Sequence, residues 1–236
     1  MKISIIGLGW FGSALAQELK NEHQVMGTTR SDEKVLAFSK QKILAEKLTN
    51  AESPSDQMLA SEIILLNIPP FKDQLAWFKN WKWNHSAHII FISSTSVYGK
   101  NKGAVDETTP LLPETENAKV LIDEENWIKT FPKYTIIRFA GLIGPDRNPA
   151  KSLSGKTNVP GGNLPVNLIH LDDCIGFTKM VIEKSLISET FNLASPEHPL
   201  RRDYYRSATF IDSEESGKIV LNLKVAKIYQ MKRSLS

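Results

Sequence analysis

Hydrophobic and polar positions along the first 145 residues fall into blocks that predict strands and helices in turn. Apolar runs of strand length occupy 3–6, 23–29, 42–48, 62–67, 88–93 and 134–139. Segments that favour helices lie between them, at 13–19, 31–40, 73–81 and 116–130, with a short helix beginning near 53–56. Apolar strands separated by helices are typical of a parallel sheet buried on both faces. The pattern therefore predicts an α/β fold with a doubly wound parallel sheet.

The pattern changes after residue 145. Residues 151–164 are rich in Gly, Asn, Pro and Ser, which predicts a mobile loop near a site. A helix is expected at 172–184 and a strand at 190–194. The C-terminal part therefore has less regular structure than the first 145 residues.

The first predicted strand runs directly into a Gly-x-Gly-x-x-Gly motif formed by Gly7, Gly9 and Gly12, and a helix follows. This context is typical of a phosphate-binding turn. Gly7 allows the tight turn, Gly9 leaves room for a pyrophosphate, and Gly12 lets the helix pack closely on the strand. The helix N-terminus supplies N–H groups and partial positive charge to an anion. A tight strand-to-helix turn without a ligand is the alternative.

Composition narrows the classes of function. The chain has 236 residues, and 29 basic against 26 acidic side chains give a net charge of +3. This charge is too small to indicate a nucleic-acid or anionic membrane partner. No apolar run approaches the length of a membrane span, and a strand from residue 3 leaves no room for a signal peptide. With Cys174 as the single cysteine, we expect a cytoplasmic protein without disulfides.

Four further segments resemble the extended short-chain dehydrogenase/reductase superfamily, and more narrowly its atypical branch of NAD(P)-dependent epimerase/dehydratase-like proteins. They are SSTSVYG at 93–99, DETTP at 106–110, RFAGLIGP at 138–145 and NLIHLDD at 167–173. The resemblance covers residues 1 to about 195. It departs from the usual pattern at Ile6, which occupies the place of the family's first glycine.

The resemblance implies a Rossmann domain at 1–145 and a small substrate-binding region at 146–236, of which about 165–195 packs back on the Rossmann domain. It also implies a bound dinucleotide, a small-molecule substrate and hydride chemistry at a hydroxyl or carbonyl group. Members of the family commonly form homodimers.

The residues at the end of the second predicted strand indicate whether the dinucleotide is NAD or NADP. An acidic residue there would favour NAD, whereas this chain has Thr29, Arg30 and Ser31, which favour the extra phosphate of NADP. We therefore expect NADP, with NAD as the alternative. Asn67, Ile68 and Pro69 follow the fourth strand, where such folds pass the cofactor ribose. Trp10 and Phe11 in the glycine motif and Ser93 at a strand end complete the expected cofactor-binding residues.

The resemblance also suggests catalytic positions. Ser94 matches the serine that holds the substrate oxygen, and Lys119 matches the family's lysine, but Thr115 stands where the proton-donating tyrosine is expected. A hydroxyl of Thr is a far weaker acid than a phenol of pKa ~10. Tyr98 is the nearest other phenol, and its alternative role is packing. We expect Lys119, Tyr98 or an ordered water to supply the proton in an active enzyme.

The sequence therefore predicts an NADP(H)-binding, epimerase/dehydratase-like oxidoreductase with an atypical catalytic centre. A non-catalytic redox sensor that binds NADP and regulates a partner is the alternative, and the missing tyrosine supports it. Whether the chain is an enzyme stays open at this point, and no motif identifies its substrate.

Overall fold

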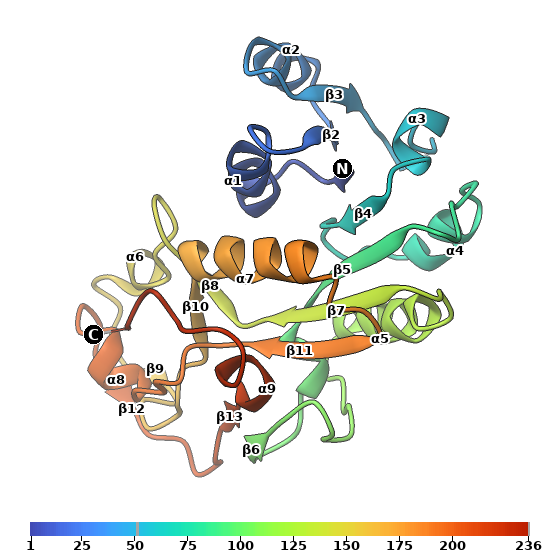
Figure 1. Ribbon diagram of the computed structural model, residues 1–236. Helices are drawn as coiled ribbons and strands as arrows, with labels where there is room; N and C mark the ends of the chain where they lie inside the picture. The colour runs from blue at the N-terminus through green and yellow to red at the C-terminus, as the bar shows by residue number, and fades with distance from the viewer. Residues whose placement is uncertain (51, 236) are drawn as a thin grey trace. The chain divides into compact units, whose positions relative to one another are not determined.

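The computed structural model describes residues 1–50 and 52–235. The strands are β1 (Lys2–Ile6), β2 (Gln24–Thr29), β3 (Leu44–Lys47), β4 (Ile63–Leu66), β5 (His88–Ser94), β6 (Gly103–Val105), β7 (Tyr134–Phe139), β8 (Gly141–Ile143), β9 (Val159–Pro160), β10 (Leu168–His170), β11 (Glu189–Leu193), β12 (Phe210–Ile211) and β13 (Lys218–Val220). The helices are α1 (Trp10–Leu19), α2 (Asp32–Lys40), α3 (Asp56–Leu59), α4 (Gln74–Lys79), the 3₁₀ helix η1 (Thr95–Tyr98), α5 (Glu116–Ile128), α6 (Ala150–Leu153), α7 (Leu171–Lys184), α8 (Arg201–Tyr204) and α9 (Leu223–Ala226). Figure 1 shows their arrangement along the chain.

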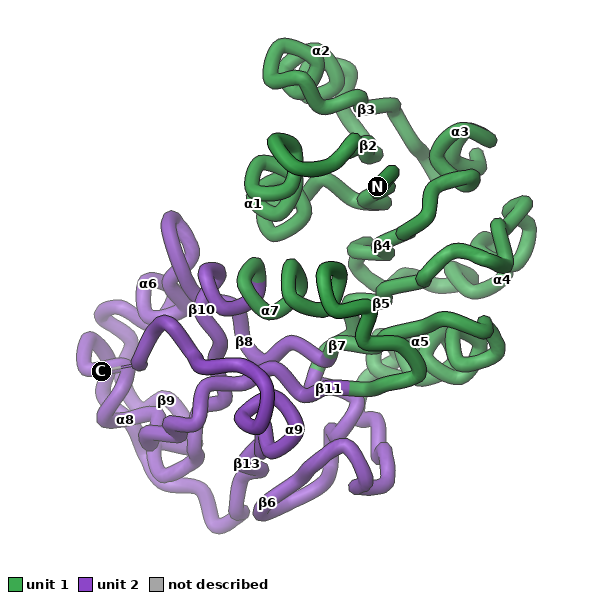
Figure 2. Tube along the Cα trace, viewed as in Figure 1, with its two compact units in different colours: residues 1–94, 115–137, 175–190 green, residues 95–114, 138–174, 191–236 purple. Residues whose placement is uncertain are grey.

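The chain divides into two compact units (Figure 2). Unit 1 comprises residues 1–94, 115–137 and 175–190, and unit 2 comprises 95–114, 138–174 and 191–236. The two units interleave along the chain, whereas the expected division was 1–145 and 146–236, with about 165–195 packing back on the first domain. The chain enters unit 2 directly after β5, returns for α5, and returns again for most of α7.

Unit 1 contains β1 to β5, most of β7 and the first residues of β11, which belong to a seven-stranded sheet in the described part of the chain with the order β11-β7-β5-β4-β1-β2-β3. The five strands from β5 to β3 pair in parallel, and Ile3 of β1 lies opposite Val25 of β2 and Ile63 of β4. Figure 1 shows α1 and α2 on one side of these strands and α3, α4 and α5 on the other. The predicted doubly wound α/β fold is confirmed.

The central strands are buried because their side chains are apolar on both faces. Ile3, Ile5 and Ile6 of β1 and the Ile64–Leu66 stretch of β4 have no exposed surface. A sheet covered by helices on both sides requires this composition. The carboxyl ends of β1, β2 and β4 meet at one edge of this core, where the glycine turn is located.

Unit 2 contains three small parallel pairs, β10–β8, β12–β9 and β13–β6. Its apolar cluster is formed by four buried residues, Ile143, Val166, Leu168 and Tyr205, and Leu235 packs against it. Within residues 1–50 and 52–235, none of the helices combines the length and the apolarity that crossing a lipid bilayer requires.

Candidate functional site

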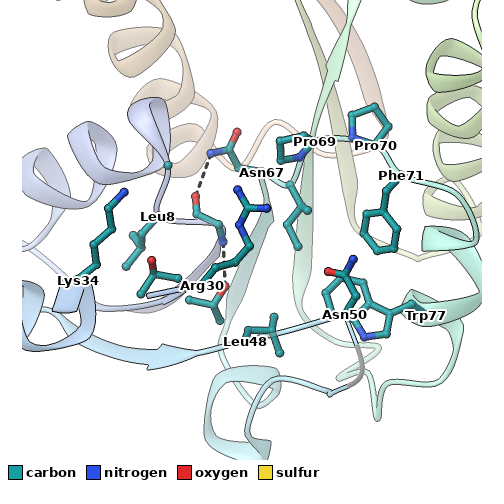
Figure 3. Close-up of a pocket in the computed structure, with 15 residues that line it drawn as sticks. Leu8, Arg30, Lys34, Leu48, Asn50, Asn67, Pro69, Pro70, Phe71 and Trp77 are labelled. Carbon is teal, nitrogen blue, oxygen red and sulfur yellow. Dashed lines mark hydrogen bonds between the residues drawn. The ribbon is translucent and has the colours of Figure 1, made fainter. Parts of the chain in front are cut away.

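The glycine turn joins β1 to α1 and is held by two hydrogen bonds from neighbouring strands. The N–H of Gly7 donates to Oγ1 of Thr28 at 3.0 Å, and Nδ2 of Asn67 donates to the carbonyl of Gly7 at 3.0 Å (Figure 3). Gly7 has a φ of 111°, which side chains with a Cβ rarely adopt. Thr28 and Asn67 therefore fix the shape of the turn from the ends of β2 and β4.

Gly12 and Gly9 differ in what surrounds them. A Cβ at Gly12 would lie 2.2 Å from the carbonyl oxygen of Gly7, so only glycine allows this close approach. A Cβ at Gly9 would meet no atom within 4 Å, so open space lies beside the N-cap of α1. Open space next to a helix N-terminus is the cradle that a pyrophosphate needs. The roles assigned to these glycines from the sequence agree with this geometry.

A cavity of about 390 Å³ opens beside the turn, entirely within unit 1. Its lining comes from the ends of β1, β2, β3 and β4, from α2 and from α4 (Figure 3): Gly7, Leu8, Gly9, Thr28, Thr29, Arg30, Lys34, Leu48, Asn50, Asn67, Ile68, Pro69, Pro70, Phe71 and Trp77. The volume lies within the range of small-molecule sites. Ligands of open α/β sheets bind at the carboxyl ends of the strands, which is where this cavity lies.

The charged side chains that line the cavity are basic. Arg30 and Lys34 contribute cations, and none of the described lining residues is acidic. Asp32, the nearest carboxylate in sequence, pairs with Lys47 at 2.6 Å and does not line the cavity. Leu48, Ile68, Phe71 and Trp77 add apolar and aromatic surface. The cavity therefore suits a ligand that combines a planar apolar ring with anionic groups.

Seven residues expected at the cofactor line this cavity: Gly7, Gly9, Thr29, Arg30, Asn67, Ile68 and Pro69. The other five expected residues, Trp10, Phe11, Gly12, Ser31 and Ser93, do not. Phe11 and Gly12 are buried in the packing of α1. The hydroxyl of Ser31 caps α2 by accepting from the N–H of Lys34 at 3.5 Å, and the hydroxyl of Ser93 donates to Oε1 of Glu125 at 2.7 Å.

Lys34, Leu48, Asn50, Phe71 and Trp77 line the cavity but were missed from the sequence. Two signals could have found all of them except Trp77. Leu48 and Asn50 follow the strand β3, and Phe71 follows β4 by a few residues, so all three come from carboxyl ends of parallel strands. Lys34 lies in the first turn of α2, shortly after Arg30.

The residues with expected catalytic roles are in different environments. Ser94 is half-buried at the end of β5. Lys119 is exposed on the first turns of α5, and its Nζ pairs with Oε1 of Glu116 at 2.5 Å. Thr115, at the place of the missing tyrosine, is the N-cap of α5 and accepts from the N–H of Ala118 at 3.2 Å. Thr115 therefore has a defined structural role at the start of the helix.

Tyr98 is fully buried in unit 2, and its hydroxyl has three partners. Nη1 of Arg138 donates to it at 2.7 Å. The hydroxyl lies 2.8 Å from the carbonyl oxygen of Asp106 and 2.9 Å from Oδ1 of Asn192, two acceptors for its one proton. Burial raises the pKa of Tyr98 above its ordinary value. This environment favours the packing role for Tyr98 over the role of proton donor.

A family model and a relative match this chain in sequence. A family model described as NADP oxidoreductase coenzyme F420-dependent matches residues 2–96. Protein YeeZ of Escherichia coli (strain K12) is 33% identical over 223 residues, which cover 86% of this chain and 81% of that protein.

Two solved structures share the fold across nearly the whole chain. UDP-glucuronic acid 4-epimerase from Bacillus cereus, solved in complex with NAD, has a TM-score of 0.79 at 20% identity and covers 100% of this chain and 95% of its own. dTDP-glucose 4,6-dehydratase from Bacillus anthracis, also solved with NAD, has a TM-score of 0.78 at 14% identity, with coverages of 99% and 92%. The chain therefore belongs to the same family as protein YeeZ, and it shares the Rossmann-type fold of the epimerase and the dehydratase.

Proposed function

We propose that the chain binds NADP(H) in the cavity of unit 1 and acts as an epimerase/dehydratase-like oxidoreductase with an atypical catalytic centre. The observation that carries the proposal is the cavity beside the glycine turn, whose charged lining consists of Arg30 and Lys34. The epimerase and the dehydratase of the same fold were solved with NAD, which supports a dinucleotide in this chain.

The preference for NADP rests on the charge at the end of β2. An acidic side chain there would accept hydrogen bonds from the ribose hydroxyls of NAD. Here Arg30 follows β2, and Lys34 adds a second cation from α2. Both cations attract the additional phosphate of NADP, and the arginine can bind it with two parallel hydrogen bonds.

The remaining groups of the cofactor fit the other parts of the cavity. Gly9 and the N-terminus of α1 would hold the pyrophosphate, because a Cβ at Gly9 would meet open space. The apolar and aromatic lining formed by Leu48, Ile68 and Phe71 would hold the adenine ring. When bound, the nicotinamide supplies hydride transfer to or from a small-molecule substrate.

The protein's own part in that chemistry is to hold the substrate oxygen and to move a proton. Ser94 at the end of β5 holds the substrate oxygen through its hydroxyl. Lys119, or a water that it orients, supplies the proton, since Thr115 is occupied as a helix cap. This assignment rests on the resemblance for Ser94 and Lys119 and on the burial of Tyr98.

A titration of the purified protein with NADPH and with NADH, followed by tryptophan fluorescence, tests the proposal. We expect NADPH to bind more tightly than NADH. Arg30→Gln and Lys34→Gln should each weaken NADPH binding by about 10- to 100-fold, because each removes a hydrogen bond to a charged group. Both variants should leave NADH binding nearly unchanged. Lys40→Gln is the matched control, because Lys40 lies on the same helix outside the cavity. Tighter binding of NADH would contradict the role of Arg30.

A non-catalytic NADP-binding regulator is the second candidate, and the capping role of Thr115 is the observation that favours it. Hydride exchange between NADPH and carbonyl compounds distinguishes the two functions. Turnover that is lost in Ser94→Ala supports the enzyme. NADPH binding without turnover, together with a protein partner that NADP releases, supports the regulator.

A further inference from the structure

A second cavity lies in unit 2, at the start of the parallel pair of β6 and β13. It has a volume of about 430 Å³, and all of its lining comes from two stretches of unit 2 and from Glu114. The first stretch, 99–102, precedes β6, and the second, 215–218, leads into β13. The two stretches are held together by the N–H of Gly103, which donates to the carbonyl of Gly217 at 3.0 Å.

The walls of this cavity are fixed by backbone contacts. A Cβ at Gly99 would lie 2.4 Å from the carbonyl oxygen of Leu112, so the loop packs directly against that segment. The N–H of Lys100 donates to the same carbonyl at 2.9 Å, and Nδ2 of Asn101 donates to the carbonyl of Pro110 at 2.8 Å. The loop that carries Lys100 is therefore held in place before any ligand arrives.

Three lysines and two glutamates line the cavity, but the charges are not fully paired. Lys102 pairs with Glu215 at 3.2 Å. Across residues 1–50 and 52–235, no carboxylate oxygen lies within 4.0 Å of Nζ of Lys100 or of Lys218. Two ammonium groups on one cavity thus lack an ion-pair partner.

Of the two lysines, Lys218 gives the stronger evidence for an anion site. Its side chain is half-buried, and its Nζ reaches the carbonyl of Gly99 only at 3.5 Å. An ammonium group has three protons to donate, and burial removes the water that would accept them. Burial lowers the pKa of Lys218, and the charge of Glu114 offsets this effect only in part. An anion bound in the cavity would stabilise the charged form of Lys218 and accept hydrogen bonds from its ammonium group.

We propose that this cavity binds the phosphate group of a small phosphorylated molecule through Lys218 and Lys100. A phosphate monoester concentrates about −1.5 to −2 charges on three acceptor oxygens at neutral pH, so one compact group can accept hydrogen bonds from both ammonium groups, and the lining carries a net charge of +1 because Glu114 also faces the cavity. Lysine binds phosphate as a point charge and needs no planar fork, in contrast to arginine. The volume beyond the phosphate accommodates the rest of a small metabolite. This site is separate from the cavity of unit 1, because no residue lines both.

The test is a titration of the full-length protein with inorganic phosphate, at constant ionic strength maintained with chloride and followed by backbone amide NMR shifts. We expect saturable shifts at residues 99–102 and 216–218. Phosphate binding at the glycine turn would instead move residues 9–13, so the two sites are resolved in one experiment. Succinate at the same ionic strength should bind more weakly.

Lys218→Met and Lys100→Met are the variants, since Met keeps most of the apolar stem of lysine. Each should weaken phosphate binding by about tenfold or more, as expected for a lost charged hydrogen bond. Lys227→Met is the matched control, an exposed lysine of unit 2 outside the cavity. Because Lys100 is exposed, its variant tests the site even if Lys218→Met does not fold. Shifts that do not saturate, that persist in both variants, or that succinate reproduces with equal affinity would overturn the proposal.

Discussion

Nη1 of Arg138 donates a hydrogen bond to the hydroxyl of Tyr98 at 2.7 Å, and the guanidinium lies 5.1 Å from the centre of the Tyr98 ring. The contact links η1 to β7 within unit 2, and Asn192 of β11 extends it. Tyr98 belongs to the SSTSVYG segment, one of the four that carry the sequence resemblance. The structure thus indicates that this phenol stabilises unit 2 from inside.

Tyr98→Phe separates a structural from a catalytic role. Removing the hydroxyl leaves Arg138 and Asn192 with one fewer partner in a buried site, so unfolding should become easier by about 1–3 kcal/mol. NADPH binding should remain unchanged, because the cavity of unit 1 does not include Tyr98. Urea denaturation and a cofactor titration measure both effects. Unchanged stability together with a lost hydride-transfer rate would show instead that Tyr98 donates the proton.

Gly9→Ala and Gly12→Ala form a matched pair on the glycine turn. At Gly9 the added methyl group meets open space, so stability should fall by less than about 1 kcal/mol, but the methyl occupies the place of the pyrophosphate. At Gly12 it would lie 2.2 Å from a backbone oxygen, so the variant should lose stability as well as binding. Melting temperature and NADPH titration distinguish the two. Normal NADPH affinity in Gly9→Ala would place the cofactor elsewhere.

The fold of unit 1 and the turn could be predicted because they depend on local signals. The central strands β1 and β4 are mostly apolar, and the spacing of Gly7, Gly9 and Gly12 indicates a close approach of backbone atoms that the structure contains. Arg30 could be placed for a similar reason, since residues at the end of β2 face the site in this topology.

The other lining residues, the division into two units and the burial of Tyr98 depend on contacts between residues far apart in the sequence. Trp77 lines the cavity only because α4 folds back beside the carboxyl ends of the strands, and no local motif marks it. The division into two units also depends on such contacts, because segment 95–114 belongs with 138–174 and 191–236, which follow it in the sequence only after α5. Burial of Tyr98 follows from Arg138 and Asn192, which lie 40 and 94 residues away.

Glu124 on α5 should make stability depend on pH. It is buried, and neither of its carboxylate oxygens has a hydrogen-bond partner among the described residues. Burial raises its pKa from 4.5 to about 8, so the folded protein keeps a proton that the unfolded chain releases. Its contribution to stability is therefore complete below pH 4.5 and is lost as the pH rises through 8.

Glu124→Gln removes this titration, because the amide stays neutral at every pH. We expect the variant to exceed the wild type in free energy of unfolding by about 3–5 kcal/mol at pH 9, and to converge with it at pH 4. Glu116→Gln, at an exposed glutamate in the first turn of the same helix, is the control and should change the pH profile little. Denaturant unfolding at pH 4, 6, 8 and 9 measures the difference. Parallel profiles for wild type and Glu124→Gln would show that Glu124 is ionised in the folded state.

Asp173, at the start of α7, holds the C-terminal segment 229–235 within unit 2. It is buried, and its carboxylate accepts from the N–H of Lys232 at 2.6 Å, the N–H of Arg233 at 3.2 Å and the hydroxyl of Tyr229 at 3.2 Å. Hydrogen bonds to a charged group contribute about 1.5–3 kcal/mol each in favourable cases, and they are not additive. Asp173→Asn, with one acceptor oxygen in place of two, should therefore lower the free energy of unfolding by about 2–3 kcal/mol.

The neighbouring Asp172 provides the control for that prediction. Asp172→Asn breaks an exposed ion pair with Nε of Arg233 at 2.7 Å, which should lower stability by less than about 1 kcal/mol. Amide hydrogen exchange resolves where the effect occurs: exchange at residues 229–235 should accelerate strongly in Asp173→Asn and only slightly in Asp172→Asn. If the two variants accelerated exchange equally, the ion pair at the surface, and not the buried carboxylate, would be what anchors the segment. Since Leu235 packs on the apolar cluster of unit 2, loss of the anchor should also expose Val166 and Tyr205, which binding of a hydrophobic dye detects.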